Sequence, residues 1–157
     1  DIEWQQKFIR LINVHLASVG LENADYEMLE NPNTDNQEQL ERGLRSITGN
    51  LSQAFIRREL QIKTVIQEVK ASPHPVILAG DFNDVPQSFI YHEVSNELKD
   101  SFEDGAEGFG KTYVKSPVPL RIDYIFYSPE LNAFNFKHIK KELSDHYPIV
   151  TDIEWQK

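Results

Sequence analysis

Four short segments of the chain combine acids, amides and imidazoles at spacings that could do chemistry. They are Asn13–Leu16 (Asn-Val-His-Leu), Gly80–Asn83 (Gly-Asp-Phe-Asn), Arg121–Tyr124 (Arg-Ile-Asp-Tyr) and Ser144–Pro148 (Ser-Asp-His-Tyr-Pro). In each segment the polar residues stand where an apolar run begins or ends, which is where a sheet presents polar groups to a cleft. Carboxylates bind divalent cations, and an imidazole can contact a phosphate oxygen or move a proton.

Asp81 and Asn83 directly follow an apolar run. Residues at i and i+2 of an extended chain point to the same side, so this acid and this amide can face one ligand. Gly80 leaves room for another backbone or a ligand to approach closely. Asp and Asn also close strands routinely as Asx turns, and this segment alone favours neither interpretation.

Asp123 lies within residues 121–127, which alternate as a strand, and its carboxylate is expected in a mostly buried layer. A buried charge needs a hydrogen-bonded partner. A histidine that must be oriented, and stabilised as imidazolium, fits that need. An ion pair with Arg121 or Arg58 fits it equally well.

Asp145 and His146 open the last apolar run of the chain. A neighbouring acid and imidazole can divide the work, with the carboxylate on a cation and the imidazole on a phosphate oxygen or a proton. Taken alone, such a dipeptide is more often a surface turn with an incidental histidine. His15, also taken alone, is more often a core histidine than a catalyst.

These segments adjoin predicted strands. Residues 8–16 are apolar on both faces, as in a buried strand, and period two places Asn13 and His15 on one face. Residues 76–80 predict a second buried strand, launched by Pro73-His74-Pro75. Further strands are predicted at 121–127 and 148–155, joined by a loop and the stretch 134–139.

Helical spacing dominates the segment from about Gln37 to Ala71, and Gly49-Asn50 is expected to divide it into two helices. A short helix is predicted at 87–97, and the polar residues 20–36 predict a long excursion at the rim of the cleft. Arg58 falls on the inward stripe of the second long helix. A buried arginine is costly unless paired, so we expect Arg58 to reach a carboxylate or backbone carbonyls in a structural role.

The composition is that of one globular domain: 157 residues, 39% of them hydrophobic and 26% charged. No run approaches the ~20 apolar residues of a membrane helix, and no signal-peptide pattern is present, so the sequence leaves the compartment open. The net charge is −9, with only one short basic cluster at 137–141. Non-specific binding to duplex nucleic acid normally uses a broad basic surface, which this chain lacks. Without cysteine there is no disulfide, thiolate zinc site or cysteine nucleophile.

Taken together and in this order, the four segments resemble the endonuclease/exonuclease/phosphatase superfamily, the deoxyribonuclease I-like metal-dependent phosphoesterases. The signatures GDFN, RIDY and SDHxP are matched letter for letter, and NxHL is matched at 13–16. Weaker echoes at 58–61, 84–86, 98–102 and 108–113 are similar to bacterial members. The resemblance runs through nearly the whole chain.

The resemblance implies an α/β fold in which a mixed β-sheet with flanking helices is part of a four-layer α/β/β/α sandwich. The active site of such proteins lies where the ends of the sheets meet. It also implies a hydrolase of phosphate esters (a phosphodiesterase, nuclease or phosphatase) that uses Mg²⁺ or Mn²⁺ and in-line attack of water on phosphorus.

Carried over residue by residue, the resemblance gives each polar side chain a role. Asp81 would orient or deprotonate the attacking water, and Asn83 would hold a phosphate oxygen. His146 would contact the scissile phosphate, oriented by Asp123. His15 would donate a hydrogen bond to phosphate or assist the leaving group.

The metal site implied by the resemblance includes Asp145, directly or through water, with Asp81 and Asn83 as further candidates. Family members also carry a strand ending in Asn and a helix with the principal metal-binding Glu, both upstream of the NxHL strand. Here only seven residues precede Phe8, and the first is not Met. We therefore expect residues 1–157 to be a single domain of this family without its N-terminal portion, and the chain to be an impaired fragment with weak cation affinity.

The sequence supports two further expectations. Exposed apolar surface on the sheet predicts self-association. The acidic balance favours a small or lipid phosphodiester over duplex DNA as the substrate. The alternative to a hydrolase is a non-catalytic interaction module, or a half-domain that needs a partner chain.

Overall fold

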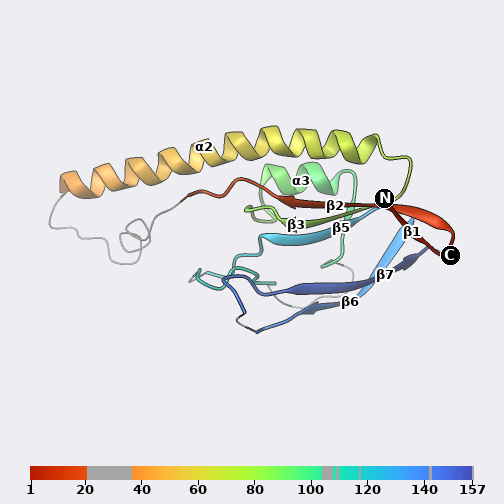
Figure 1. Cartoon of the computed structure of the whole chain (residues 1–157). Coiled ribbons are helices and arrows are strands. Elements are labelled where there is room, and N and C mark those ends of the chain that lie inside the picture. Colours follow the sequence, from red (N-terminus) through yellow and green to blue (C-terminus); the bar gives the residue numbers. More distant parts are fainter. Residues whose placement is uncertain (21–36, 104–107, 109, 117, 142, 157) are drawn as a thin grey trace.

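The structure, a computed structural model, describes residues 1–20, 37–103, 108, 110–116, 118–141 and 143–156. Two helices cover one face of a five-stranded sheet, and a two-stranded sheet lies against the other face (Figure 1). The described residues thus make three layers. The elements are β1 (Ile2–Trp4), β2 (Lys7–His15), α2 (Gln37–Lys70), β3 (Val76–Asp81), α3 (Phe89–Ser95), β4 (Lys99–Asp100), β5 (Asp123–Tyr127), β6 (Leu131–His138) and β7 (Ile149–Trp155).

The five-stranded sheet is mixed, with strand order β1-β2-β3-β5-β4. β2 and β3 run parallel and are connected through α2, whereas β3 and β5 are antiparallel. Parallel strands need a long crossover, and α2 supplies it. The predicted α/β class, a mixed sheet with flanking helices, is confirmed. A four-layer sandwich remains an expectation for the whole family domain.

Each face of the central sheet has its own apolar core. On the helix side, residues of α2, α3, β3 and β5 meet around Ile62, Leu78 and Phe126, none of which is exposed. On the other side, Ile9 of β2 packs with the β6–β7 sheet around Leu131. That second layer leaves the far end of the same β2 face open, where Leu11, Asn13 and His15 are exposed.

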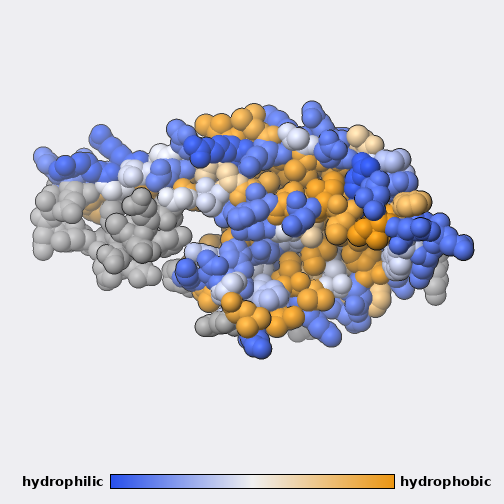
Figure 2. All heavy atoms as spheres, viewed as in Figure 1, coloured by the Kyte–Doolittle hydropathy of each residue, from blue (hydrophilic) through white to orange (hydrophobic). Residues whose placement is uncertain are grey.

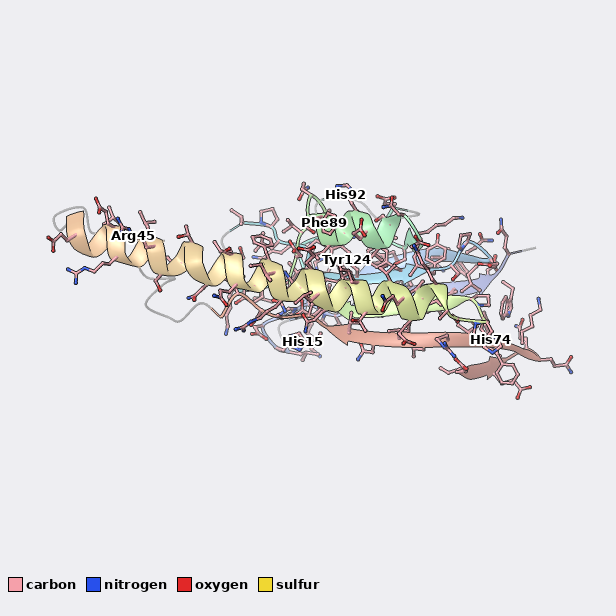
Figure 3. The ribbon with its side chains drawn as sticks, turned by 90° about the horizontal axis from the view of Figure 1, so that it is seen from above. His15, Arg45, His74, Phe89, His92 and Tyr124 are labelled. Atoms are coloured by element: carbon pink, nitrogen blue, oxygen red, sulfur yellow. The ribbon has the colours of Figure 1, made fainter. Side chains whose placement is uncertain are left out.

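α2 is one helix of 34 residues, so the predicted division at Gly49-Asn50 is wrong. A glycine within a helix costs only about 1 kcal/mol relative to alanine. Ile47 and Ala54, on either side of it, are both buried, and one continuous helix keeps their shared stripe facing inward. The N-terminal part of α2, with Arg45, extends past the end of the sheet where His15 lies (Figure 3).

The remaining predicted elements are found with shifted ends. The short helix is trimmed to Phe89–Ser95, because Ser88 caps it by accepting a hydrogen bond from the Tyr91 N–H. Residues 134–138 of the predicted stretch 134–139 belong to the longer β6, which pairs with β7. Residues 21–36 of the predicted excursion lie outside the described residues. No helix of the described part combines the length and apolar character that a membrane span needs.

Candidate active site

Three of the predicted site residues form a row across the sheet. His15, Asp81 and Asp123 are the last residue of β2, the last of β3 and the first of β5, and strand register pairs His15 with Asp81 and Asp81 with Asp123. All three lie on one face, because side chains alternate along each strand and the register keeps them in phase. His15 Nε2 lies 3.5 Å from Asp81 Oδ2. Its side chain is 75% exposed, and that of Asp81 is 16% exposed.

Gly80 allows the first two strands of this row to pair. A Cβ at this position would lie 1.9 Å from the carbonyl oxygen of Val14, and Gly80 has a φ of +141°. Both features exclude a side chain here. The predicted close approach of another backbone at Gly80 is confirmed, and that backbone is β2.

Asp81 and Asn83 make the Asx turn that the sequence allowed. The Asn83 N–H donates to Asp81 Oδ1 at 2.8 Å, and the residue has a φ of +50°. The Asn83 side-chain NH₂ group lies 3.1 Å from Asp81 Oδ2 and donates to the Leu16 carbonyl at 3.0 Å. Asn83 therefore fixes the Asp81 carboxylate and joins the ends of β2 and β3.

His146 joins the row from a distant part of the chain. Its Nδ1 lies 2.8 Å from Asp123 Oδ2, which is the histidine partner that the sequence allowed for this acid. The alternative ion pairs are wrong, because Arg121 pairs with Asp100 and Arg58 with Asp84.

The segment 112–114, to which sequence reasoning assigned no role, positions that contact. Thr112 Oγ1 accepts hydrogen bonds from the N–H groups of Ile122 and Asp123. The Thr112 carbonyl accepts from the Tyr147 N–H, and the ring of Tyr113 packs on that of His146 at 5.3 Å. The sequence carries no signal for this role, because the burial of Thr112 is apparent only in the structure.

Arg58 holds the other side of the site together. Its side chain is buried, its Nε lies 3.0 Å from Asp84 Oδ2, and one terminal nitrogen donates to the Ala17 carbonyl at 2.9 Å. The Ala17 N–H donates to Gln61 Oε1 at 2.9 Å. The prediction that Arg58 reaches a carboxylate or carbonyls is confirmed. Asp84 was missed as its partner, although it directly follows Asn83.

The cluster of Asp81, Asp123 and His146 could hold a metal ion, because one ligand atom of each lies within 4.8 Å of the others. Burial raises the pKa of Asp81 above its ordinary 3.8, and the nearby Asp123 carboxylate raises that pKa further, against the lowering effect of the Asn83 N–H. A divalent cation would relieve this repulsion, so the donor set fits such an ion. Asp145 is not one of the three residues of this cluster; it is exposed, with its carboxylate 3.7 Å from Lys115 Nζ, and its metal role remains a prediction.

Comparison with models of known protein families shows to which family the chain belongs. The model of the endonuclease/exonuclease/phosphatase family matches residues 8–146, which include the first three motifs and the Ser-Asp-His part of the fourth. The chain belongs to the endonuclease/exonuclease/phosphatase family. No curated protein matches the chain.

Solved structures of endonuclease/exonuclease/phosphatase proteins share this fold. A family protein from Leptotrichia buccalis C-1013-b is 21% identical with a TM-score of 0.59, over 98% of this chain and 52% of that one. One from Bacteroides vulgatus is 25% identical with a TM-score of 0.54, over 64% and 44%. The human Nocturnin catalytic domain with bound sulfate is 21% identical with a TM-score of 0.50, over 64% and 40%. The chain spans about half the length of the solved structures it matches.

In this endonuclease/exonuclease/phosphatase chain, the polar cluster lies in a cleft of about 1230 Å³. Figure 2 shows the molecule hollowed beneath α2. The cleft brings together every polar residue that the sequence singled out for chemistry: His15, Asp81, Asn83, Asp123, Asp145 and His146. Arg58 also reaches its wall.

Proposed function

We propose that this site hydrolyses phosphate esters with a divalent cation, Mg²⁺ or Mn²⁺, by in-line attack of water on phosphorus. The observation that carries the proposal is the joining of Asp81, Asp123 and His146 in one cluster, with His15 beside it. Membership of a family of metal-dependent phosphoesterases supports it. Two carboxylates and two imidazoles at one end of a cleft can bind a cation and still leave groups for proton transfer.

Asp81 acts on the attacking water in this proposal. Its Oδ1 accepts from the Asn83 N–H and its Oδ2 from the Asn83 side-chain NH₂ group. A carboxylate oxygen has a further lone pair, so Oδ2 can still orient water and accept its proton. Because burial raises its pKa, Asp81 is a stronger base than an exposed carboxylate. A cation held by the carboxylates of Asp81 and Asp123 would neutralise the charge that develops on the phosphoryl oxygens, and His146 Nε2 would stay available to the substrate.

His146 and His15 act on the phosphate and the leaving group. With Nδ1–H donated to Asp123, His146 presents Nε2 to the cluster, 3.9 Å from Asp81 Oδ2. When His146 is protonated, Nε2–H donates to a phosphate oxygen while Asp123 stabilises the imidazolium. His15 is exposed at the end of β2, where it can donate to the leaving oxygen.

The test is hydrolysis of bis(p-nitrophenyl) phosphate by the chain with Mg²⁺ or Mn²⁺, alongside His146→Ala. The matched control is His92→Ala, because His92 is an exposed histidine on α3, away from His15 (Figure 3). We expect metal-dependent turnover that His146→Ala lowers by about 10²–10⁴-fold and His92→Ala leaves unchanged. Equal turnover by the two variants would contradict the proposal.

A further inference from the structure

The cleft has an apolar wall beside its polar end, and this wall is unused by the chemistry above. Leu51 and Phe55 of α2 form one side of it. Val85, Val118, Leu120 and Ile122 also line the cleft. Phe55 is 49% exposed and Val118 is 55% exposed. Large apolar side chains exposed at a catalytic cleft are available to bind an apolar part of a substrate.

We propose that the substrate is a phosphate ester with one alkyl chain that lies along α2 against Leu51 and Phe55. This inference rests on the proposed function, because it places the phosphate at the cluster of Asp81, Asp123 and His146. It adds the substrate class, and it assigns Phe55 as a residue that determines specificity.

Phe55 is fixed relative to the polar end of the cleft. Its ring lies 4.8 Å from the guanidinium carbon of Arg58, and Arg58 is held by Asp84 at 3.0 Å and by the Ala17 carbonyl at 2.9 Å. Asp84 follows Asn83 in the chain, and Ala17 lies two residues after His15. A continuous series of contacts therefore joins the apolar wall to the polar cluster, and a preformed wall loses little entropy on binding.

The charges around the cleft disfavour a polyanionic substrate. Among the described residues that line it, Arg58 is the one lysine or arginine, and Arg58 is 1% exposed with its charge paired to Asp84. Lys115, beside the cleft, lies 3.7 Å from the Asp145 carboxylate. A nucleic-acid strand needs cations along its backbone for the phosphates that flank the scissile one. An apolar substituent needs none.

The kinetic test uses p-nitrophenyl esters of methyl, butyl and octyl phosphate with Mn²⁺. Each buried methylene is worth up to roughly a fourfold change, so we expect kcat/KM to rise at least tenfold from methyl to octyl. Phe55→Ser should lower kcat/KM for the octyl ester at least fivefold more than for the methyl ester. The matched control is Phe89→Ser, an exposed phenylalanine on α3 (Figure 3) that is not among the residues of the cleft.

A binding measurement separates this inference from the proposed function. Calorimetry with methyl, butyl and octyl phosphate needs no turnover, and affinity should rise with chain length in the wild type and in Phe89→Ser but not in Phe55→Ser. If nothing is hydrolysed but this pattern appears, the proposed function fails and the apolar subsite stands. If the three esters are hydrolysed with equal kcat/KM, the proposed function stands and the inference is overturned. Tighter binding of a short single-stranded oligonucleotide than of octyl phosphate would also overturn it.

Discussion

His146 Nδ1 lies 2.8 Å from Asp123 Oδ2, although the two residues are 23 positions apart in the sequence. The side chain of His146 is 27% exposed and that of Asp123 is 17% exposed. A histidine held through Nδ1 has its ring plane and tautomer set, so only Nε2 remains for a substrate. Asp123 therefore orients the ring of His146. A substitution that keeps the shape of the Asp123 side chain can test this role.

Asp123→Asn should lower turnover of bis(p-nitrophenyl) phosphate by about 10²–10⁴-fold, because a neutral amide can neither fix the tautomer of His146 nor stabilise its imidazolium. Asp152→Asn is the matched control, since Asp152 is exposed on β7 and its partner Asn135 is neutral. The measurement is kcat/KM with saturating Mn²⁺. Equal values for the two variants would show that Asp123 does not act through His146.

Gly80→Ala and Gly49→Ala should change stability in opposite directions. The added Cβ at Gly80 would meet the Val14 carbonyl at 1.9 Å, whereas at Gly49 it meets nothing within 4 Å. We expect Gly80→Ala to cost at least about 3 kcal/mol of the free energy of unfolding, from strain and lost β2–β3 pairing. Gly49→Ala should add about 0.5–1 kcal/mol, because alanine favours the helix. Urea unfolding measures both, and a stable Gly80→Ala variant would refute the close packing of the two strands.

Arg58→Met should lower the free energy of unfolding by about 3–5 kcal/mol, because it leaves the Asp84 carboxylate buried without its cation. Adding Asp84→Asn should restore part of that loss, since a buried amide is less costly than a buried charge. Arg57→Met, at the exposed neighbour of Arg58 on α2, should change stability by less than about 0.5 kcal/mol. If the double variant is no more stable than Arg58→Met, loss of the Arg58–Asp84 ion pair is not the cause of the lower stability.

Asp81→Asn should stabilise the chain at neutral pH in the presence of a chelator. The folded pKa of Asp81 is raised by burial above the 3.8 of the unfolded chain, so its ionised form opposes folding. The destabilisation grows as pH rises from 3.8 through the folded pKa and is absent below 3.8. Urea unfolding between pH 3.5 and 7.5 should show a stability gap between variant and wild type that closes toward the acid end. A gap of constant size would point to a cause other than titration of Asp81.

Mn²⁺ should stabilise the wild-type chain more than Asp81→Asn. A ligand at 100 times its Kd adds about 2.7 kcal/mol to the folded state when it binds only that state. Thermal unfolding of each protein across a Mn²⁺ titration measures the difference. Identical shifts in Tm would place the cation away from the cluster of Asp81, Asp123 and His146.

Several polar residues of the cleft could be found in the sequence because they stand at the ends of predicted strands. Apolar runs such as 76–80 mark strands buried on both faces, and the first polar side chain after such a run must reach the sheet edge. Asp81, Asp123 and His15 were recognisable in this way. Arg58 was recognisable as a charge on an apolar helix stripe that needed a partner.

The partners themselves depend on tertiary structure. Asp84 lies 26 residues from Arg58, and Asp100 lies 21 residues from Arg121, so local pattern does not pair them. The division of α2 at Gly49-Asn50 failed for a related reason. Local propensity at two residues favours a break, but burial of Ile47 and Ala54 on one stripe outweighs about 1 kcal/mol of glycine preference.

The in-register row of His15, Asp81 and Asp123 has a consequence for how such a protein can change over time. Inserting or deleting one residue within β2 or β3 would turn both core and polar side chains to the opposite faces of the sheet. The polar site at the strand ends and the apolar core would then be lost together. The apolar wall comes from α2 and the loops around Val85 and Val118, whose side chains are outside that pairing. New substrates can therefore be accommodated by changing the wall while the strand lengths stay constant.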